Sequence, residues 1–251
     1  MPVIVKGTYF DKKPPLVCVP VCETSFADTI ATITNLADKG VSMMEWRADY
    51  FEELADLERV KALLYNVKEA VAQIPFLVTV RSDTQGGRCK FSKDQIAATL
   101  LGIAETHVAD FIDVEAFFFE GAKSLINDLH EKGALVIASH HDFEKTKETD
   151  LLEQMLSEMN DLDPDMVKLA VMPQSFSDVL SLMEASRNFA DQNPMMPVIS
   201  ISMGEEGLLS RIAGEMTGSV ITFGTEKEVS APGQIPRKDL EEILRLIHKY
   251  A

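Results

Sequence analysis

The residue with the most specific chemical potential in this sequence is Lys168, which lies inside an apolar run at residues 165–172. The length and composition of the run predict a buried β-strand. Side chains alternate along a strand, so the lysine shares a face with Met166, Ala170 and Met172. A buried amine is costly unless it is used, and a neutral lysine amine forms an imine with a ketone. Taken alone, the strand favours the alternative of an edge lysine whose ammonium reaches water along its own stem.

Polar side chains at a spacing of two residues recur in five other apolar segments, close to where each segment ends. This spacing places side chains on one face of a strand, and the active sites of parallel barrels lie at the C-terminal ends of their strands. One such group is often a structural ion pair, but recurrence in adjacent segments favours a functional site and a chemical role for the lysine. The groups are Glu45, Arg47 and Asp49; Thr79 and Arg81; Asp113 and Glu115; Ser139 and His141; and Ser200 and Ser202.

One of the five histidines, His141, fits the same site. His140 and His141 are adjacent and therefore face opposite sides of a strand, and only His141 shares the face of Ser139. Its imidazole could remove and return a proton near neutral pH. Two neighbouring histidines on opposite faces cannot bind one ion, and no other set of His, Cys and carboxylate residues has metal-site spacing. We therefore expect neither a metal nor a cofactor.

Strand and helix signals alternate along the whole chain. Eight strand–helix pairs at this length predict an α/β protein of one domain over residues 1–251, a (β/α)8 TIM barrel. A short strand or hairpin at residues 3–10 would precede the barrel. An open doubly wound sheet is the alternative, although the turn after the first strand lacks the glycines of a dinucleotide-binding loop. The predicted strands are residues 16–21, 43–49, 76–81, 111–116, 135–142, 166–172, 197–203 and 220–224.

Composition bounds the class of protein. The chain has 251 residues, of which 24 are basic and 40 acidic, and its formal charge is −16. Such a charge argues against nucleic acid or an anionic membrane as partner, and an anionic substrate would need a local basic pocket. Cys18, Cys22 and Cys89 are an odd number without metal-ligand spacing, which is typical of a reducing compartment. Without a signal-peptide pattern or a membrane-length apolar run, we expect a cytoplasmic protein.

Another basic side chain, Arg211, and a loop at residues 230–236 follow the seventh predicted strand. The guanidinium of Arg211 suits a carboxylate ligand. The proline and glycine residues of the loop at 230–236 predict a defined turn, which would act as a lid that places Ser230 and Gln234 over the site. The alternative is an ordinary connection to the last helix.

Six ordered motifs resemble the type I 3-dehydroquinate dehydratase family along nearly the whole chain. They are Glu45-Trp46-Arg47-Ala48-Asp49, Thr79-Val80-Arg81, Ser139-His140-His141-Asp142-Phe143, Val167-Lys168-Leu169-Ala170-Val171, Ser210-Arg211 and Ser230-Ala231-Pro232-Gly233-Gln234. The resemblance implies a (β/α)8 barrel without a metal ion, a homodimer, and an enzyme of the shikimate pathway. Its reaction would be the syn elimination of water from the small molecule 3-dehydroquinate, which gives 3-dehydroshikimate.

The resemblance also implies a role for each candidate residue. Lys168 would form an imine with the substrate ketone, and His141 would remove the acidified proton beside it and protonate the departing hydroxyl. Arg211 would take the substrate carboxylate, and the remaining residues would hold hydroxyl groups and the lid. The substrate-binding set is Glu45, Arg47, Arg81, Arg211, Ser230 and Gln234.

The sequence departs from the family pattern at Gln85, where the family commonly has glutamate before two glycines. An amide keeps hydrogen bonding but loses charge and proton transfer, so we assign Gln85 at most a positioning role. Two other functions remain open. A class I aldolase also places an imine lysine on the sixth strand of a barrel, although no clear phosphate site follows the last two strands. A non-catalytic barrel that binds carboxylates would have no need for both Lys168 and His141.

Overall fold

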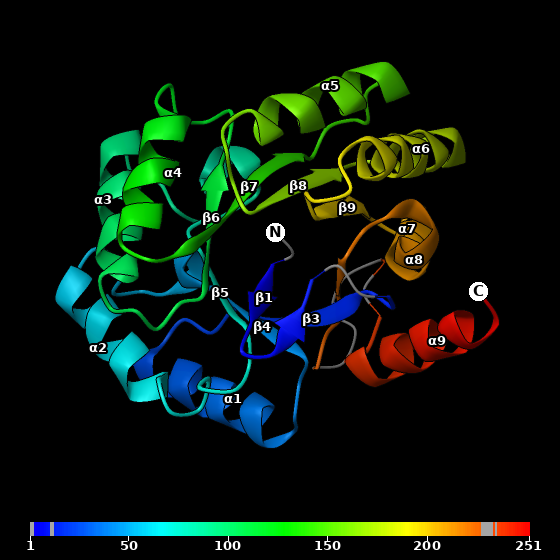
Figure 1. Ribbon diagram of the computed structural model, residues 1–251. Helices are drawn as coiled ribbons and strands as arrows, with labels where there is room; N and C mark the ends of the chain where they lie inside the picture. The colour runs from blue at the N-terminus through cyan, green and yellow to red at the C-terminus, as the bar shows by residue number, and fades with distance from the viewer. Residues whose placement is uncertain (1–2, 11–12, 227–232, 234) are drawn as a thin grey trace. The chain divides into compact units, whose positions relative to one another are not determined.

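The computed structural model describes residues 3–10, 13–226, 233 and 235–251 (Figure 1). Eight strands form one sheet in the order β10-β3-β4-β5-β6-β7-β8-β9, so the last strand lies beside the first. This is the strand order of the predicted (β/α)8 barrel, and the alternative of an open doubly wound sheet is wrong. The strands are β3 (Leu16–Val21), β4 (Met43–Arg47), β5 (Phe76–Thr79), β6 (Phe111–Glu115), β7 (Leu135–Asp142), β8 (Met166–Val171), β9 (Val198–Ser202) and β10 (Ile221–Phe223).

The strands of the sheet are buried on both faces, although several carry a polar or charged side chain. Every residue of β5, β6, β8 and β9 is buried. Burial on both faces is typical of parallel strands that are covered by crossover helices, and the pairs with a defined register are all parallel. A charged side chain on such a strand must therefore be paired or used.

A β-hairpin precedes the sheet, as predicted for residues 3–10. It joins β1 (Ile4–Val5) to β2 (Thr8–Tyr9) in antiparallel pairing. The two turn residues, Lys6 and Gly7, have φ of 50° and 77°. Positive φ at both positions matches the twist of the two strands, and glycine adopts it without steric cost.

Several helices begin where a short polar side chain accepts a backbone N–H group. Ser25, Asp56 and Ser92 do so, and Ser92 forms a reciprocal capping box with Gln95. No described helix is both long and apolar enough to cross a lipid bilayer. The helices are α1 (Phe26–Asp38), α2 (Leu57–Val67), α3 (Lys93–Ala104), α4 (Ala122–Glu131), α5 (Thr149–Asn160), α6 (Phe176–Gln192), α7 (Leu208–Ile212), α8 (Gly214–Thr217) and α9 (Arg237–Tyr250), with the 3-10 turns η1 (Ala48–Tyr50) and η2 (Asp83–Gln85).

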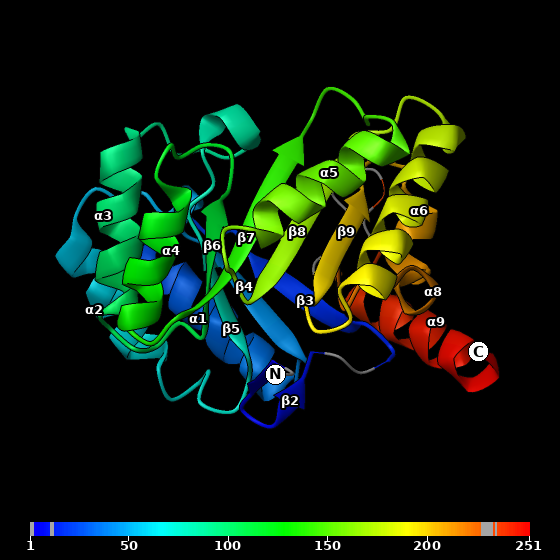
Figure 2. The same cartoon turned by 45° about the horizontal axis from the view of Figure 1, so that its top comes forward.

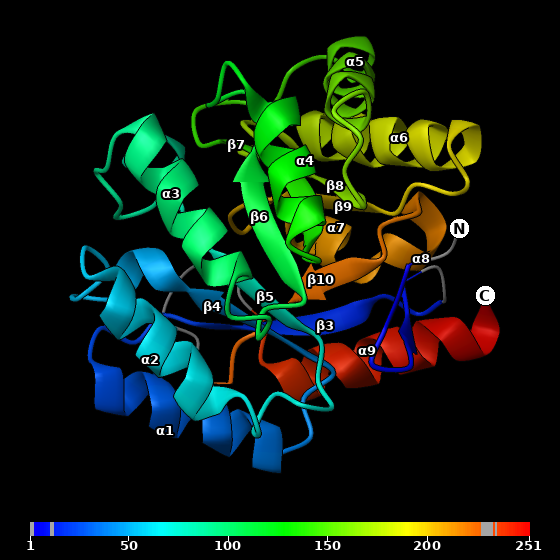
Figure 3. The same cartoon turned by 60° about the vertical axis from the view of Figure 1, so that its left-hand side comes forward.

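The chain divides into two compact units. The terminal unit contains residues 1–19 and 138–251, and the central unit contains residues 20–137. In the terminal unit α5 packs against α6, and α6 covers one face of β9 (Figure 2). In the central unit α1 packs against α2, and α2 against α3 (Figure 3). The single domain expected over residues 1–251 stays a prediction.

Two strands end earlier than predicted. β4 ends at Arg47, so Asp49 lies in η1 and not on the strand. β5 ends at Thr79, so Arg81 lies beyond it. The alternation of side chains along a strand therefore does not position Asp49 or Arg81, and the turns after the strands do.

Candidate active site

Lys168 lies in the middle of β8 with only 4% of its surface exposed. Its Nζ is 4.6 Å from the centroid of the Phe223 ring on β10. In the sheet, β9 lies between β8 and β10, and α6 covers one face of β9. The amine of Lys168 therefore reaches the Phe223 ring on the face of the sheet that α6 does not cover. An edge lysine whose ammonium reaches water does not fit this burial. The face of an aromatic ring attracts the ammonium form and helps to hold the side chain in place.

His141 is the penultimate residue of β7 and is half-buried. The carbonyl of the next residue, Asp142, accepts the N–H of Met172 at 2.9 Å. This bond holds the end of β7 beside the end of β8. His141 and Lys168 therefore lie on neighbouring strands. The end of β7 that carries the imidazole adjoins Met172, and Met172 is four residues after Lys168 in the sequence.

Arg211 lies in the last turn of α7 and has no counter-ion among the described residues. Its Nε is shielded from solvent and forms no hydrogen bond within the described part of the chain. Burial lowers the pKa of this guanidinium, and no described negative charge offsets the effect. An uncompensated cation of this kind favours an anionic ligand, and the planar guanidinium matches a carboxylate.

The junction of β9 and α7 sets the position of Arg211. The Ser210 hydroxyl accepts the N–H of Ser202 at 2.9 Å and donates to the carbonyl of Gly207 at 2.8 Å. Gly207 approaches the strand so closely that a Cβ atom there would overlap the Ser202 carbonyl. Ser210 thus anchors the helix, while its neighbour Arg211 keeps its guanidinium for a ligand.

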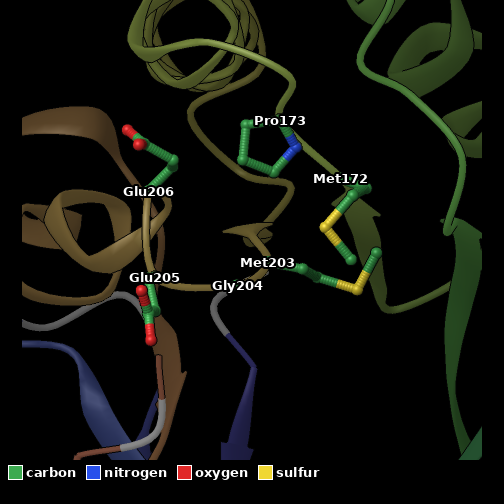
Figure 4. A pocket seen from close by; sticks show the side chains of 6 residues that line it. All are labelled: Met172, Pro173, Met203, Gly204, Glu205 and Glu206. Atoms are coloured by element: carbon green, nitrogen blue, oxygen red, sulfur yellow. The ribbon is translucent and has the colours of Figure 1, made fainter. Parts of the chain in front are cut away.

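A cavity of about 380 Å³ lies at the C-terminal ends of β8 and β9. The thioethers of Met172 and Met203 lie side by side on one side of it, and Glu205 and Glu206 lie on another (Figure 4). The N–H of Met203 donates to the carbonyl of Val171 at 2.8 Å, which keeps the two methionines at adjacent strand ends. The cavity lining is Met172, Pro173, Met203, Gly204, Glu205 and Glu206.

The predicted lid residues Ser230 and Gln234 lie outside the described residues. Gly233 is described, and its φ is +76°. A Cβ atom on Gly233 would overlap the carbonyl of Gly204, which lines the cavity. The backbone at position 233 therefore packs directly against the cavity wall.

In the central unit, Arg47 is held by the carboxylate of Asp49. Nε donates to Oδ1 and Nη2 to Oδ2, each at 2.8 Å. Burial lowers the pKa of the guanidinium, but the hydrogen bonds and charge of Asp49, together with the charge of Glu45, outweigh burial and raise that pKa above its usual value. Arg47 is therefore a permanent cation with a fixed orientation.

Arg81 is 3% exposed and lies between two carboxylates. Nη2 donates to Asp113 at 2.8 Å and Nη1 to Glu115 at 3.0 Å. Burial lowers the pKa of Arg81, but these two charges outweigh burial and raise it. Glu115 also accepts the N–H and the hydroxyl of Ser82, at 2.9 and 2.6 Å. Arg81 is thus the centre of a buried charge network.

The central-unit candidates belong to one cluster. Glu45 accepts the hydroxyl of Thr79 at 2.7 Å. The positive charge of Arg47 lowers the pKa of Arg81, because the two guanidinium groups lie near each other. Burial raises the pKa of the Cys22 thiol to about 11. The charge of Arg47 lowers this pKa and the charge of Glu45 raises it, so both side chains lie near the thiol. The structure therefore brings Glu45, Arg47 and Arg81 together beside a half-buried cysteine.

Sequence reasoning missed the cavity lining and the contacts of Cys22 and Ser82. Met172 shares the predicted strand face of Lys168, so the sequence did carry a signal for it. The contact of Ser82 with Glu115 arises in the turn after β5 and leaves no periodic signal. Among the described residues, no group of three or more His, Cys, Asp or Glu side chains is arranged to hold a metal ion.

Comparisons of the sequence and of the structure with known proteins all match the same family. A family model described as type I 3-dehydroquinase matches residues 17–251. The 3-dehydroquinate dehydratase of Clostridioides difficile strain 630 is 38% identical over 98% of this chain and 96% of that protein, and that of Klebsiella pneumoniae strain 342 is 36% identical over 98% of each. The structure of the type I enzyme of C. difficile with covalently modified comenic acid has a TM-score of 0.97, at 38% identity, over 100% of this chain and 99% of that one. The Geobacillus kaustophilus HTA426 enzyme has a TM-score of 0.94, at 28% identity, over 100% and 98%.

Proposed function

The chain belongs to the type I 3-dehydroquinase family, and from this membership we propose that it dehydrates 3-dehydroquinate to 3-dehydroshikimate through an imine on Lys168. The reaction is a hydro-lyase step of the shikimate pathway. The observation that carries the proposal is a lysine amine buried on the inner face of a parallel sheet, at 4.6 Å from an aromatic ring. The relative from C. difficile was solved with a covalently modified ligand, which supports covalent chemistry in this family.

The steps follow from the chemistry of the two catalytic groups. The neutral amine of Lys168 attacks the substrate ketone, and loss of water gives an imine. The imine withdraws electrons from the adjacent carbon, and His141 removes a proton from that carbon to give an enamine. The enamine expels the neighbouring hydroxyl, which leaves as water with the proton from His141. Hydrolysis of the product imine releases 3-dehydroshikimate and restores the amine.

Arg211 binds the substrate carboxylate in this proposal. Its support is the buried Nε and the absence of a counter-ion among the described residues. A carboxylate there would form charge-assisted hydrogen bonds with a guanidinium that has none in the described structure. The Met172 and Met203 side chains give the carbon ring an apolar wall.

The central-unit residues Glu45, Arg47 and Arg81 bind hydroxyl groups in the same proposal. Carboxylates accept hydrogen bonds from hydroxyl groups, and guanidinium groups donate hydrogen bonds to hydroxyl oxygens, so this cluster suits a polyhydroxylated ring. Ser230 and Gln234 complete the binding set on the evidence of their motif alone.

Gln85 has at most a positioning role. It is 6% exposed, in the turn η2 that follows β5. The loop folds back so tightly that a Cβ atom on Gly87 would overlap the carbonyl of Arg81. An uncharged amide can take part in hydrogen bonds without adding a fifth carboxylate to the unit that already holds Glu45, Asp49, Asp113 and Glu115.

Reduction of the imine tests the proposed reaction. The protein is incubated with 3-dehydroquinate and borohydride, and the peptides are analysed by mass spectrometry. We expect a reduced adduct on Lys168 and, without borohydride, formation of an ultraviolet-absorbing enone. Lys168→Ala should lose both the adduct and turnover by several orders of magnitude. An unmodified Lys168, or full activity in Lys168→Ala, would contradict the proposal.

We also propose that the enzyme is a cytoplasmic homodimer. The free thiols of Cys18, Cys22 and Cys89 support a reducing compartment, and the family resemblance supports the dimer. Light scattering after size exclusion should give about twice the chain mass of 27.8 kDa. A mass equal to one chain at micromolar concentration would rule out the dimer.

A further inference from the structure

We propose that Asp49 is a positioning residue for substrate binding, which fixes the Arg47 guanidinium before the substrate arrives. The inference rests on the proposed role of Arg47 in holding the substrate. Asp49 itself is not expected to touch the substrate, because its side chain is fully buried, whereas 20% of the Arg47 side chain is exposed.

The fork between the two side chains leaves one edge of the guanidinium for a ligand. Nε and Nη2 of Arg47 are bound to the two oxygens of Asp49 at 2.8 Å each. Nη1 takes no part in this fork and carries two further N–H donors. A bidentate pair fixes the plane as well as the position of the guanidinium, so the direction of these donors is set by Asp49.

Asp49 also ties Arg47 to the loop after β5. Its Oδ2 accepts the backbone N–H of Arg88 at 3.0 Å. Both guanidinium groups lie over the Tyr50 ring, with Cζ of Arg47 at 5.1 Å and Cζ of Arg88 at 4.1 Å from the ring centroid. The carboxylate of Asp49 therefore holds one edge of Arg47, whose guanidinium also lies over an aromatic ring, and the same carboxylate anchors the loop that contains Gln85.

Stability alone does not explain this arrangement. Burying an ion pair removes two charges from water, and a buried pair is often no more stable than apolar side chains of the same size. Preorganisation does explain it, because a guanidinium that is already immobile loses less conformational freedom when a ligand binds. Loss of the fork should therefore affect KM more than kcat.

Asp49→Asn breaks the fork while keeping the shape of the side chain. The amide offers one acceptor oxygen, so an NH₂ group must face either the guanidinium or the N–H of Arg88. We expect KM for 3-dehydroquinate to rise about tenfold and kcat to change by less than about threefold. Arg47→Lys keeps the charge but cannot form the fork, and should raise KM similarly.

The double variant separates positioning from an independent structural role. If Asp49 acts through Arg47, Asp49→Asn adds less than about twofold to the KM of Arg47→Lys. If the increases in KM of the two single variants multiplied in the double variant, the inference would be wrong. A wild-type KM in Asp49→Asn would also overturn it. If Asp49→Asn does not fold, Arg47→Lys decides alone, because a wild-type KM there would show that the fork is dispensable.

Glu53→Gln is the matched control, since it breaks a fork of the same geometry on the surface of the same unit. Arg59 donates from Nε to Oε2 of Glu53 at 2.6 Å and from Nη2 to Oε1 at 2.9 Å. This variant should keep the wild-type KM. A wild-type protein that forms neither product nor adduct would refute the proposed function itself. An active wild type with an unchanged KM in Asp49→Asn would refute only the positioning role.

Discussion

At the residue scale, the thiol of Cys22 reports the electrostatic character of the central-unit cluster. Burial is the largest cause that raises its pKa to about 11, and Glu45 and Asp49 add to the rise while Arg47 opposes it. The raised pKa keeps the thiol protonated at neutral pH, so it is a weak nucleophile there. Because the pKa rises from its ordinary value of 9.0 to about 11, the folded protein has about 100-fold less thiolate at Cys22 below pH 9 than an unfolded chain.

We therefore predict that iodoacetamide modifies Cys22 in the folded protein about 100-fold more slowly at pH 8 than in urea. The rate should keep rising with pH up to about 11. Peptide mass spectrometry over a pH series measures this, with Cys22→Ser to assign the peptide. A rate that levels off by pH 9 would show that the carboxylates and burial do not control the thiol.

Strand periodicity explains which site residues the sequence could predict. A polar residue inside an apolar strand defines its own face, because the alternation of side chains is fixed by geometry; this held for the burial of Lys168. The partners of Arg81 could not be chosen from sequence, since several carboxylates of equal charge were available. The fork of Asp49 depends on the turn η1 and on side-chain rotamers, neither of which leaves a periodic signal.

At the element scale, the contact between Gly207 and β9 determines where α7 begins. There is no room for a side chain at this glycine, because a Cβ atom would overlap the Ser202 carbonyl. We predict that Gly207→Ala lowers the free energy of unfolding by about 1–3 kcal/mol and raises KM, because α7 must move and take Arg211 with it. Thermal unfolding and steady-state kinetics measure the two effects.

The matched control is Gly121→Ala at the start of α4. A Cβ atom there would meet nothing within 4 Å, and φ is −108°, which any residue adopts. Gly121→Ala should leave KM unchanged, and its free energy of unfolding should equal or slightly exceed that of the wild type. If Gly207→Ala behaved like this control, the junction would not position Arg211.

Local sequence explains where some of the helices begin and where one helical segment is interrupted. Ser25 and Ser92 cap α1 and α3, because short hydroxyl side chains accept N–H groups that have no partner within the helix. The helical segment after β9 is interrupted at Ala213 and forms α7 and α8. Gly214 follows Ala213 directly and begins α8, and a Cβ atom there would overlap the Pro15 side chain and the Ser219 carbonyl, so close packing accompanies the interruption.

At the scale of the whole molecule, the fold was the easiest feature to predict. Eight alternations of strand and helix in 251 residues leave few architectures, and the strand order agrees with the one predicted. The division of the chain into two compact units could not be predicted, because it depends on the density of packing between helices and strands and not on the order of elements.

The charge of Arg211, which has no counter-ion in the described part of the chain, should be measurable in the stability of the whole protein. We predict that Arg211→Met raises Tm of the ligand-free protein by roughly 2–4 °C, because a costly buried cation is replaced by an apolar side chain. The same variant should raise KM at least about 100-fold, since the carboxylate loses its charged partner. Calorimetry and kinetics give the two values. A fall in Tm with an unchanged KM would mean that Arg211 is structural.

The guanidinium of Arg211 also bears on how long the protein survives in a cell. If Arg211 binds the substrate carboxylate as proposed, a molecule without substrate would unfold more often than one that holds it, because no described residue neutralises this guanidinium. Proteases degrade the unfolded fraction, so scarcity of the metabolite would shorten the half-life of the enzyme and abundance would extend it. A single arginine would in this way link the amount of catalyst to the supply of its substrate.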